Sequence, residues 1–554
     1  MDFLVHHLLQ STALKLPDKE ALVHRQQRLT YAEVAQKVLS LAKGLRNCGL
    51  QKSDKPTLKG TALSEGVPQG DTASHISFRA HKGMASLRLG IYLDASIPQV
   101  LSLMGISQAG GVFVTMNSLL LPEQVVHIAN DCQMKGLITT AKKLSALESA
   151  IKNIPSLEFV VVVADGEIPQ ISLPTYDFEE LCSIEASGNL PDLAIEKDLA
   201  ALIYTSGSTG KPKGVMLDHA QILAGSSIVS DYLKITQSDR ILAVLPFSFD
   251  AGLNQLTTAF QQGSTLVLIS FTFAREIVQT LIKEKITALA GVPTLWGLMV
   301  QPRSSMAKHQ FPHLRYITNT GGRMPQTVLA KLREYLPQTQ IFLMYGLTEA
   351  FRSTYLPPEQ LDLRPTSIGK AIPNTEILVI NDDGQPCKPG EVGELVHRGP
   401  TVSLGYWGQP ELTAQRLRNH PLQPAEYGNS EKVCYSGDLV TMDEEGFLYF
   451  VSRRDMTIKS SGFRISPTEV EEALMASGEL QAAAVIGVPD DLLGQTIKAF
   501  VVASEGIELD TQSLLKFCAE KLPNYAIPKQ IEVLDRLPQT TSGKVNYSAL
   551  RQKG

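Results

Sequence analysis

The sequence lacks any strong excess of charge and any regular spacing of cysteines. Its net charge is −5 over 554 residues, and charged residues make up 19%. A polyanion-binding surface and a disordered tail are therefore not indicated, and we expect no nucleic-acid partner. No CxxC spacing occurs, which argues against a disulfide framework and a structural zinc site. We expect reduced, mostly packed thiols at Cys48, Cys132, Cys182, Cys387, Cys434 and Cys518.

The sequence also lacks a targeting signal and a long apolar run. Asp2 stands near the N-terminus, where a signal peptide needs basic residues, and no apolar segment reaches the length of a membrane span. We therefore expect no membrane span and a cytoplasmic location. The length of 554 residues exceeds what one hydrophobic core usually supports, so two or more domains are expected.

What the sequence does contain is an apolar segment that leads directly into a loop of hydroxyls, glycines and lysines, at residues 202–214. Glycine lets the backbone approach an anion closely, while hydroxyls add hydrogen-bond donors and lysines add positive charge. The order differs from a Walker A loop, because only two residues separate Gly207 from Gly210, and Pro212 follows Lys211. A flexible surface linker is the other interpretation. We predict a phosphate cradle for a nucleoside triphosphate, formed by Thr205, Ser206, Gly207, Ser208, Thr209, Gly210, Lys211 and Lys213.

Strand-like and helix-like segments alternate over residues 90–400. Such alternation favours a mainly parallel α/β arrangement. After Gly390 the pattern changes to strands separated by turns, at 393–398 and 446–451, which indicates a smaller β-rich subdomain. In the α/β part, strands are predicted at 111–115, 159–163, 241–245, 265–269 and 288–292.

The C-terminal part of the chain is predicted to form a separate, small α+β domain. Its first helix is expected to begin with Ser466 as the cap, Pro467 at the first helical position and Glu469 at the third. We place the domain boundary after Arg454, which gives an N-terminal domain of residues 1–454 and a C-terminal domain of residues 455–554. Residues 55–88 show no clear apolar period, so we interpret them as a surface insertion.

Four polar clusters follow the glycine-rich loop. Thr348 and Glu349 come at a predicted strand end, where a carboxylate beside a triphosphate would be a ligand of Mg²⁺. Asp438 is expected to follow a turn and to accept hydrogen bonds from ribose hydroxyls. A cationic turn covers residues 452–464, and Lys544 lies in a polar loop near the C-terminus. Each cluster, taken singly, can also be a plain turn or a solvated surface.

With these motifs in this order, the chain resembles the adenylate-forming superfamily, which contains acyl-CoA synthetases, luciferases and the adenylation domains of peptide synthetases. The likeness covers nearly the whole chain outside residues 55–88. It implies a large region of α/β layers plus a β-rich subdomain, joined by a hinge to a mobile C-terminal domain. It also implies that ATP and Mg²⁺ activate a carboxylic acid, and that the acyl group passes to a thiol of CoA or of a separate carrier protein.

The resemblance implies a role for each matching residue at the nucleotide. The loop from Thr205 to Lys213 would bind the phosphates, and Thr348 and Glu349 would meet the α-phosphate and Mg²⁺. Ser436 stands where threonine is more usual in the family, and it keeps the hydroxyl. The adenine and ribose would be bound by Gly321, Gly322, Tyr345, Asp438, Arg453 and Arg464.

In the mobile domain the resemblance implies that Lys544 is the adenylation lysine and Asp455 the hinge. Lys544 would bridge the acid carboxylate and the α-phosphate, which repel each other, in the transition state. After rotation of the domain, Lys459 would face the active site as a catalytic residue of the second step. Gly462 would leave room there for the pantetheine arm.

Three segments would line the substrate pocket and contribute Phe249, Asp250, Thr320, Met344 and Arg352. Amino-acid-activating members have an aspartate at the position of Asp250, which pairs with the substrate's ammonium. A buried carboxylate needs a cationic partner, because an unpaired one is costly. Arg352 is the other candidate for that partner and would leave an ordinary acyl pocket. Both interpretations stay open, and a luciferase-like monooxygenase or a non-catalytic nucleotide-binding protein is the alternative function.

Overall fold

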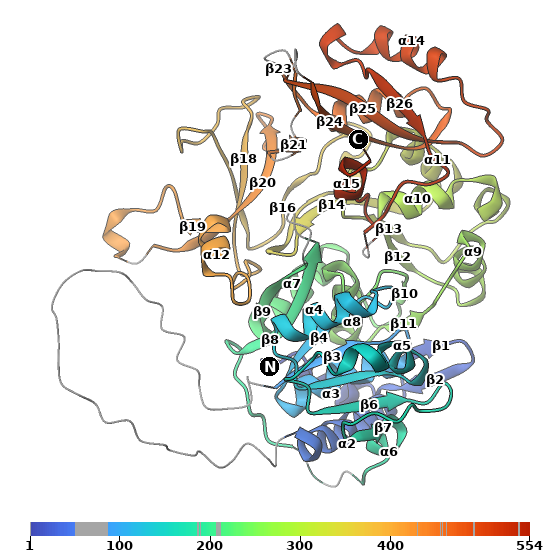
Figure 1. Cartoon of the computed structure of the whole chain (residues 1–554), viewed down its shortest axis with the longest axis vertical. Helices are drawn as coiled ribbons and strands as arrows, with labels where there is room; N and C mark the ends of the chain where they lie inside the picture. Colours follow the sequence, from blue (N-terminus) through green and yellow to red (C-terminus); the bar gives the residue numbers. More distant parts are fainter. Residues whose placement is uncertain are drawn as a thin grey trace.

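The computed structural model describes residues 2–49, 87–185, 188, 190–206, 212–428, 430–454, 456, 458–460, 463–490, 494–540 and 543–553. These residues form two large sheets with their helices, a smaller β-rich part and a C-terminal α+β part (Figure 1). This arrangement confirms the expected fold class.

The two large sheets are mainly parallel. Antiparallel pairs lie toward their ends, such as β8–β9 in the first sheet and β14–β15 in the second. The seven-stranded sheet has the order β7 (Thr175–Asp177), β6 (Phe159–Val163), β5 (Gly136–Thr140), β3 (Arg88–Tyr92), β4 (Val112–Thr115), β8 (Leu199–Ser206) and β9 (Pro212–Asp218). The nine-stranded sheet has the order β16 (Lys370–Ala371), β15 (Ala350–Leu356), β14 (Gln340–Leu347), β13 (Tyr316–Asn319), β12 (Ala288–Gly291), β10 (Arg240–Ala243), β11 (Thr265–Leu268), β1 (Glu20–His24) and β2 (Gln27–Thr30).

Alternate residues of the central strands face two different hydrophobic cores. In β6, Phe159 and Val161 join one core, while Val160 and Val162 join another. A parallel strand that is covered on both faces is apolar throughout, which is why this strand could be predicted from the sequence. The accompanying helices are α1 (His7–Lys15), α2 (Tyr31–Gly49), α3 (Ile97–Ala109), α4 (Pro122–Asp131), α5 (Ala141–Ile151), α6 (Phe178–Cys182), α7 (His219–Tyr232), α8 (Asp250–Gln262), α9 (Ala274–Lys283), α10 (Pro293–Met299) and α11 (Gln326–Tyr335).

The remaining elements form the β-rich part and the C-terminal part. The β-rich part contains β17 (Glu376–Ile380), β18 (Gly393–Arg398), α12 (Pro410–Arg416), β19 (Leu417–Asn419), β20 (Lys432–Met442) and β21 (Leu448–Arg453). The C-terminal part contains β22 (Ile458–Ser460), β23 (Phe463–Ile465), α13 (Pro467–Met475), β24 (Leu480–Asp490), β25 (Gly494–Ala503), α14 (Thr511–Lys521), β26 (Gln530–Val533) and α15 (Tyr547–Arg551). Asp455 lies outside the described residues, so the domain boundary stays a prediction.

Three local predictions can be compared with the structure. Helix α13 begins at Pro467 with Ser466 as its N-cap, as expected, although the Ser466 hydroxyl donates to the carbonyl of Val451 and does not cap the helix. Asp438 does not follow a turn, because it lies inside β20; the positive φ of Gly437, +73°, occurs within the strand. Residues 55–86 of the predicted insertion lie outside the described ranges, while Arg88, its last residue, is buried at the start of β3.

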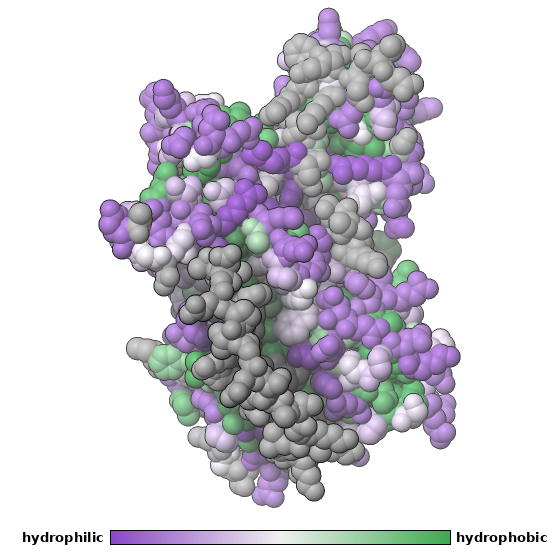
Figure 2. All heavy atoms as spheres, turned by 60° about the vertical axis from the view of Figure 1, so that its left-hand side comes forward, coloured by the Kyte–Doolittle hydropathy of each residue, from purple (hydrophilic) through white to green (hydrophobic). Residues whose placement is uncertain are grey.

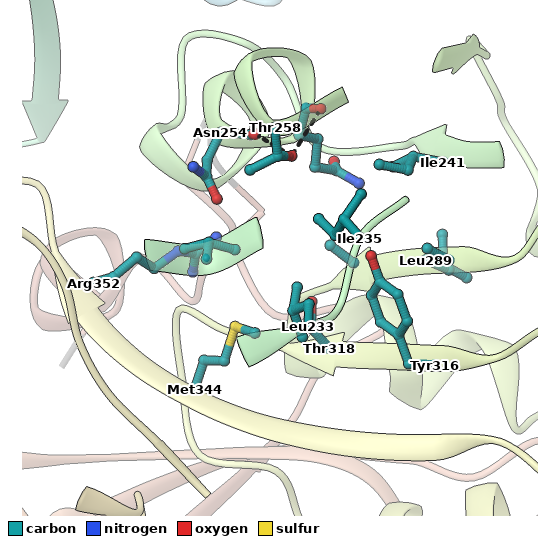
Figure 3. A pocket seen from close by; sticks show the side chains of 14 residues that line it. Leu233, Ile235, Ile241, Asn254, Thr258, Leu289, Tyr316, Thr318, Met344 and Arg352 are labelled. Atoms are coloured by element: carbon teal, nitrogen blue, oxygen red, sulfur yellow. Dashed lines mark hydrogen bonds between the residues drawn. The ribbon is translucent and has the colours of Figure 1, made fainter. Parts of the chain in front are cut away.

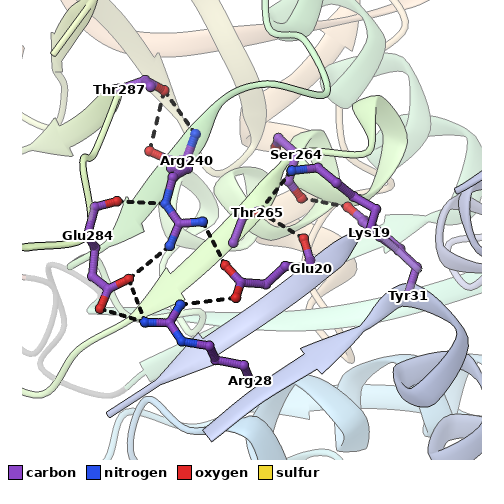
Figure 4. A network of polar contacts seen from close by, with 9 residues as sticks. All are labelled: Lys19, Glu20, Arg28, Tyr31, Arg240, Ser264, Thr265, Glu284 and Thr287. Carbon is purple, nitrogen blue, oxygen red and sulfur yellow. Dashed lines mark hydrogen bonds and ion pairs between the residues drawn. The ribbon is translucent and has the colours of Figure 1, made fainter. Parts of the chain in front are cut away.

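Two arginines and two glutamates link strands at one edge of the nine-stranded sheet (Figure 4). Arg240, at the start of β10, contacts Glu20 at 2.6 Å and Glu284 at 2.9 Å. Arg28 contacts the same two carboxylates, each at 3.0 Å. Glu284 is buried, and its two arginine partners offset the cost of removing its charge from water.

Among the described residues, the helices are all too short or too polar to cross a membrane. The face shown in Figure 2 is mostly hydrophilic, with hydrophobic areas between the polar ones. Large apolar side chains that are strongly exposed include Leu14, Leu119 and Leu121.

Candidate functional site

The hairpin of β14 and β15 carries the polar residues at the centre of the site. Its turn contains Thr348, which is buried, and Glu349, which is half-buried. The Tyr345 hydroxyl, near the end of β14, donates to Oδ2 of Asp438. Burial raises the pKa of Tyr345 well above its usual value, with the Asp438 carboxylate adding to the shift, so the phenol stays a neutral donor.

Asp438 is held from a second side by Arg453. The two residues are opposite each other in the pair of β20 and β21, and the Arg453 Nε lies 3.4 Å from Oδ1 of Asp438. The structure thus brings together Tyr345, Asp438 and Arg453, which lie on three different strands. A hydroxyl, a carboxylate and a guanidinium together can bind a polar ligand such as a sugar.

Lys544 reaches the same site from the C-terminal part. Its Nζ lies 5.0 Å from the ring centroid of Phe249, and the neighbouring Gly543 carbonyl accepts a hydrogen bond of 2.7 Å from Thr294. Gly321 has a φ of +78°, and a Cβ added there would lie 2.8 Å from Cε of Lys544. The absence of a side chain at Gly321 therefore leaves room for the lysine.

The ammonium of Lys544 lies among several carboxylates. Burial lowers its pKa from the usual value, and the carboxylate of Asp250 opposes that shift most strongly among the charged groups. Arg453 adds to the lowering, whereas Asp438 and Glu349 oppose it. The lysine thus lies between the residues predicted for the nucleotide and those predicted for the acid.

The phosphate-loop prediction falls largely outside the described residues. Gly207, Ser208, Thr209, Gly210 and Lys211 are not described. Its two ends are paired, because Thr205 of β8 lies opposite Lys213 of β9 in an antiparallel register. The side chains of Ser206, Lys459 and Arg464 are also outside what is described, as are Asp455 and Gly462.

Sequence reasoning missed Tyr406. This residue connects β9, which follows the predicted phosphate loop, to the hairpin of β14 and β15. Its hydroxyl donates to Oε1 of Glu349, and its backbone forms a bridge with Val215 of β9. The next residue, Trp407, donates its backbone N–H to the Gly214 carbonyl at 2.8 Å. The signal was a Gly-Tyr-Trp-Gly run, in which an aromatic pair between glycines indicates a close backbone approach.

A cavity of about 30 Å³ lies next to this centre (Figure 3). Arg352 and Asn254 lie toward one end in that view, and Ile241 and Leu289 toward the other. The cavity is lined by Val229, Leu233, Ile235, Ile241, Asn254, Gln255, Thr258, Ala288, Leu289, Ala290, Tyr316, Thr318, Met344 and Arg352. Met344 and Arg352 were predicted here from the sequence, whereas Asn254 and Gln255 were missed.

Several buried polar atoms around the pocket have no hydrogen-bond partner within the residues that the structure describes. They are Oδ1 of Asp250, Nδ2 of Asn254, Oε1 of Gln255 and Nε of Arg352. Asp250 is the first residue of α8, where the helix dipole favours a carboxylate. A second cavity, of about 10 Å³, is lined by both Asp250 and Asn254. Unpaired polar groups at a cavity indicate a place where a polar ligand binds.

Arg352 does not neutralise Asp250. In the part of the chain that the structure describes, no ion pair joins these two residues, and Oδ1 of Asp250 and Nε of Arg352 both have no hydrogen-bond partner there. The Arg352 Nη1 instead donates to Oγ1 of Thr320 at 3.0 Å. The alternative in which Arg352 is the internal partner of Asp250 is therefore wrong for this structure.

Comparisons with known proteins identify the family. The model of the family described as "AMP-binding enzyme" matches residues 78–407, and that of "AMP-binding enzyme C-terminal domain" matches residues 469–544. A feruloyl-CoA synthase of Amycolatopsis sp. is 30% identical over 547 residues, covering 97% of this chain and 96% of that protein. A long-chain-fatty-acid–CoA ligase of Bacillus subtilis is 28% identical over 565 residues, covering 97% of this chain and 92% of that protein.

A solved structure has the same fold. It is o-succinylbenzoate coenzyme A synthetase from Bacillus subtilis in complex with ATP and magnesium ion. Its TM-score is 0.76 at 25% sequence identity, and the match covers 99% of this chain and 98% of that one.

Proposed function

Because the chain belongs to the AMP-binding enzyme family, as an AMP-forming acid–CoA ligase that uses ATP and Mg²⁺, we propose that Lys544 is the residue that promotes attack of the acid on ATP. The position of its side chain against Gly321 and Phe249 is the observation that carries this proposal, and the carboxylates of Asp250, Asp438 and Glu349 act on its pKa.

In the first step, an oxygen of the acid's carboxylate attacks the α-phosphorus of ATP. The bond between this phosphorus and the bridging oxygen breaks, and pyrophosphate leaves with the electron pair. Both reactants are anionic, so positive charge is needed where they meet. Lys544 provides it as a cation, and Gly321 leaves room for the side chain to approach.

The residues of the nucleotide end would hold ATP for this attack. Asp438 would accept hydrogen bonds from the ribose, and its orientation is fixed by Tyr345 and Arg453. Gly321 and Gly322 would lie against the adenine. We assign the phosphates to the loop between β8 and β9 on its composition of glycines, hydroxyls and lysines.

Glu349 fits the requirements of a magnesium ligand. Its carboxylate is half-buried, accepts one hydrogen bond from Tyr406 and forms no ion pair within the described ranges. A carboxylate oxygen is the donor that Mg²⁺ prefers. When bound, the ion would supply positive charge that stabilises the departing pyrophosphate.

In the second step, the thiol of CoA attacks the carbonyl carbon of the acyl-adenylate, the thioester bond forms, and AMP leaves. We propose that Lys459 and Gly462 serve this step and that the part after Asp455 rotates between the steps. Support for such a change comes from Lys544, which lies against Gly321 and Phe249 and would be displaced when a thiol replaces it at the acyl-adenylate.

A second candidate is the loading of an amino acid onto a carrier protein. The unpaired Oδ1 of the buried Asp250 favours it, because a substrate ammonium would satisfy this oxygen. Asp250 is also the charged group that raises the pKa of Lys544 most, so this carboxylate fits a substrate without an amine as well.

The proposal is tested by acid-dependent exchange of pyrophosphate into ATP, followed by product analysis. We expect exchange with small polar acids, and AMP plus a CoA thioester when CoA is added. Thioester on a phosphopantetheinyl carrier protein but not on CoA would favour the second candidate. Exchange that is absent with every acid tested would contradict the proposed roles.

A further inference from the structure

Arg352 is a buried cation without a counter-charge. Its side chain is 4% exposed, and within the described part of the chain it forms no ion pair. Among the same described residues, Nη1 donates to Thr320 and the buried Nε has no partner. Arg240, by contrast, has two carboxylates, from Glu20 and Glu284. A guanidinium that has lost its water needs an anion to offset that loss, so the site of Arg352 is incomplete as it stands.

The backbone holds Arg352 in a costly conformation. Its φ is +60°, in the left-handed region that residues other than glycine rarely adopt. The register of β14 and β15 shifts at this point, with Gly346 opposite the bulge. A Cβ at Gly346 would lie 2.9 Å from the Arg352 Cα, so glycine is needed for this close approach. Bulges next to active sites often redirect a side chain, which agrees with the placement of Arg352 at the cavity.

The wall near Arg352 is polar, although it belongs to a buried helix. Asp250, Asn254 and Thr258 lie four residues apart on α8 and thus share one face. Asn254 and Thr258 line the same cavity as Arg352 (Figure 3). The end of the cavity near Arg352 therefore offers polar partners to a ligand, while Ile241 and Leu289 line the other end.

The reacting end and the cationic end are adjacent in the chain. Arg352 bonds to Thr320, and Lys544 packs on Gly321, the next residue. An acid whose carboxylate meets Lys544 can therefore present a second group to Arg352.

We propose that the acid substrate carries a second carboxylate, which Arg352 binds in this cavity. The inference rests on the proposed function and narrows its substrate class to dicarboxylic acids, with or without an amino group for Asp250. The planar guanidinium can donate two parallel N–H bonds to a carboxylate, and this would satisfy the orphaned Nε. Arg352 is then a specificity-determining residue, since it binds the end of the acid that does not react.

The test uses matched acids that differ only in the second carboxylate. They are propanoic and propanedioic, butanoic and butanedioic, and pentanoic and pentanedioic acid, together with the 2-amino forms of the two longer pairs. Pyrophosphate exchange gives kcat and KM for the full-length wild type and for Arg352→Met, Arg352→Lys and the control Arg275→Met. Arg275 is exposed on α9, far along the chain from the pocket residues.

We expect the wild type to prefer one dicarboxylic acid over its partner by about a hundredfold in kcat/KM. Arg352→Met should remove this preference mainly by raising KM. The contact between Arg352 and the second carboxylate is equally strong in the bound substrate and in the transition state, so its loss should change kcat little. Arg352→Lys should keep part of the preference, and Arg275→Met all of it. Equal activity of the wild type on both acids of every pair would overturn the proposal, as would an equal loss on both in Arg352→Met.

Melting temperatures with each acid, without ATP, separate this inference from the proposed function. If the wild type shows no exchange at all, the proposed roles fail, yet a stabilisation by dicarboxylic acids that Arg352→Met abolishes still supports the binding site. A dicarboxylic acid that stabilises neither protein, or both alike, overturns it. Methionine packs like the apolar stem of arginine, so the variant is expected to fold, and Arg352→Lys provides the same comparison if it does not.

Discussion

At the proposed nucleotide end of the site the polar groups bind one another, whereas in the proposed acid pocket several have no partner among the described residues. Asp438 is held by Tyr345 and Arg453, and Glu349 by Tyr406. In the pocket, Asp250, Asn254 and Arg352 each keep a buried atom unpaired. Preformed pairs fix the geometry for a ligand that never changes, and unpaired groups are completed by the ligand that the enzyme selects.

The largest expected effect is that of Lys544→Ala, which removes the cation lying between the two ends. Its charge acts mainly in the transition state, so exchange should fall by several orders of magnitude for every acid, while ATP binding changes little. Steady-state exchange and the melting temperature check this. A rate near that of wild type would mean that the lysine does not promote the attack.

At neutral pH, Asp250→Asn should act mainly on binding of the acid. If the carboxylate binds an ammonium, the apparent affinity for an amino acid should drop by about ten- to a thousandfold, with the KM for ATP unchanged. Acids without an amine should be much less affected. The comparison of exchange for paired acids with and without the 2-amino group checks this, and equal losses for both would remove the ammonium role.

The same substitution should move the pH profile. Asp250 raises the pKa of Lys544, so its loss should lower that pKa further. Because the lysine acts as a cation, activity should then be lost at a lower pH on the alkaline side. The pH dependence of kcat for acids without an amine checks this, and an unmoved alkaline limb would show that the two groups are not coupled.

Tyr345→Phe should act at the nucleotide end and more weakly. It removes one hydrogen bond to Asp438 but leaves the contact with Arg453, so the KM for ATP should rise by about fivefold. The rise should be the same with every acid. A change in the ranking of acids would show that the two ends are not independent.

Glu471→Gln lies outside both ends and should leave activity alone while changing the pH dependence of stability. Burial raises the Glu471 pKa to about 7, and its carboxyl accepts hydrogen bonds from Tyr547 and from the Val485 N–H. The unfolded chain binds fewer protons than the folded one between the usual carboxyl pKa of 4.5 and about 7, so stability should fall as pH rises through this window. Melting temperatures from pH about 5 to about 8 should fall less steeply in the variant.

The local structure of the proposed nucleotide end was largely predictable, because its residues lie in short runs along the sequence. A strand, a glycine and a Thr-Glu pair placed Tyr345 and Glu349 together, and the apolar run before residue 207 predicted β8. The prediction that Asp438 follows a turn was wrong, since Ser-Gly resembles a turn but here lies within a long strand, and its role at the ribose stays a prediction. The partner Tyr406 could not be paired with Glu349 from sequence, because tertiary packing brings them together.

The proposed acid pocket was less predictable, because the kind of substrate that it fits depends on which of its polar atoms have no partner. Asp250 and Arg352 were recognised as unusual, but whether they pair depends on a few ångströms of packing. The left-handed backbone of Arg352 arises from a bulge between two strands, which no composition or period reveals. In the sequence, Asn254 cannot be distinguished from other polar residues of a helix, because nothing there shows which face of α8 lines the cavity.

The hairpin of β14 and β15 has a consequence for how the two ligands affect one another. It contributes Tyr345 and Glu349 to the nucleotide end, and Met344 and Arg352 to the acid pocket. An acid that stabilises the ATP-binding conformation of this hairpin would raise the affinity for ATP by some factor. ATP must then raise the affinity for that acid by the same factor. The natural substrate would thus be recognised before any bond breaks, as the acid with the strongest mutual effect on ATP binding.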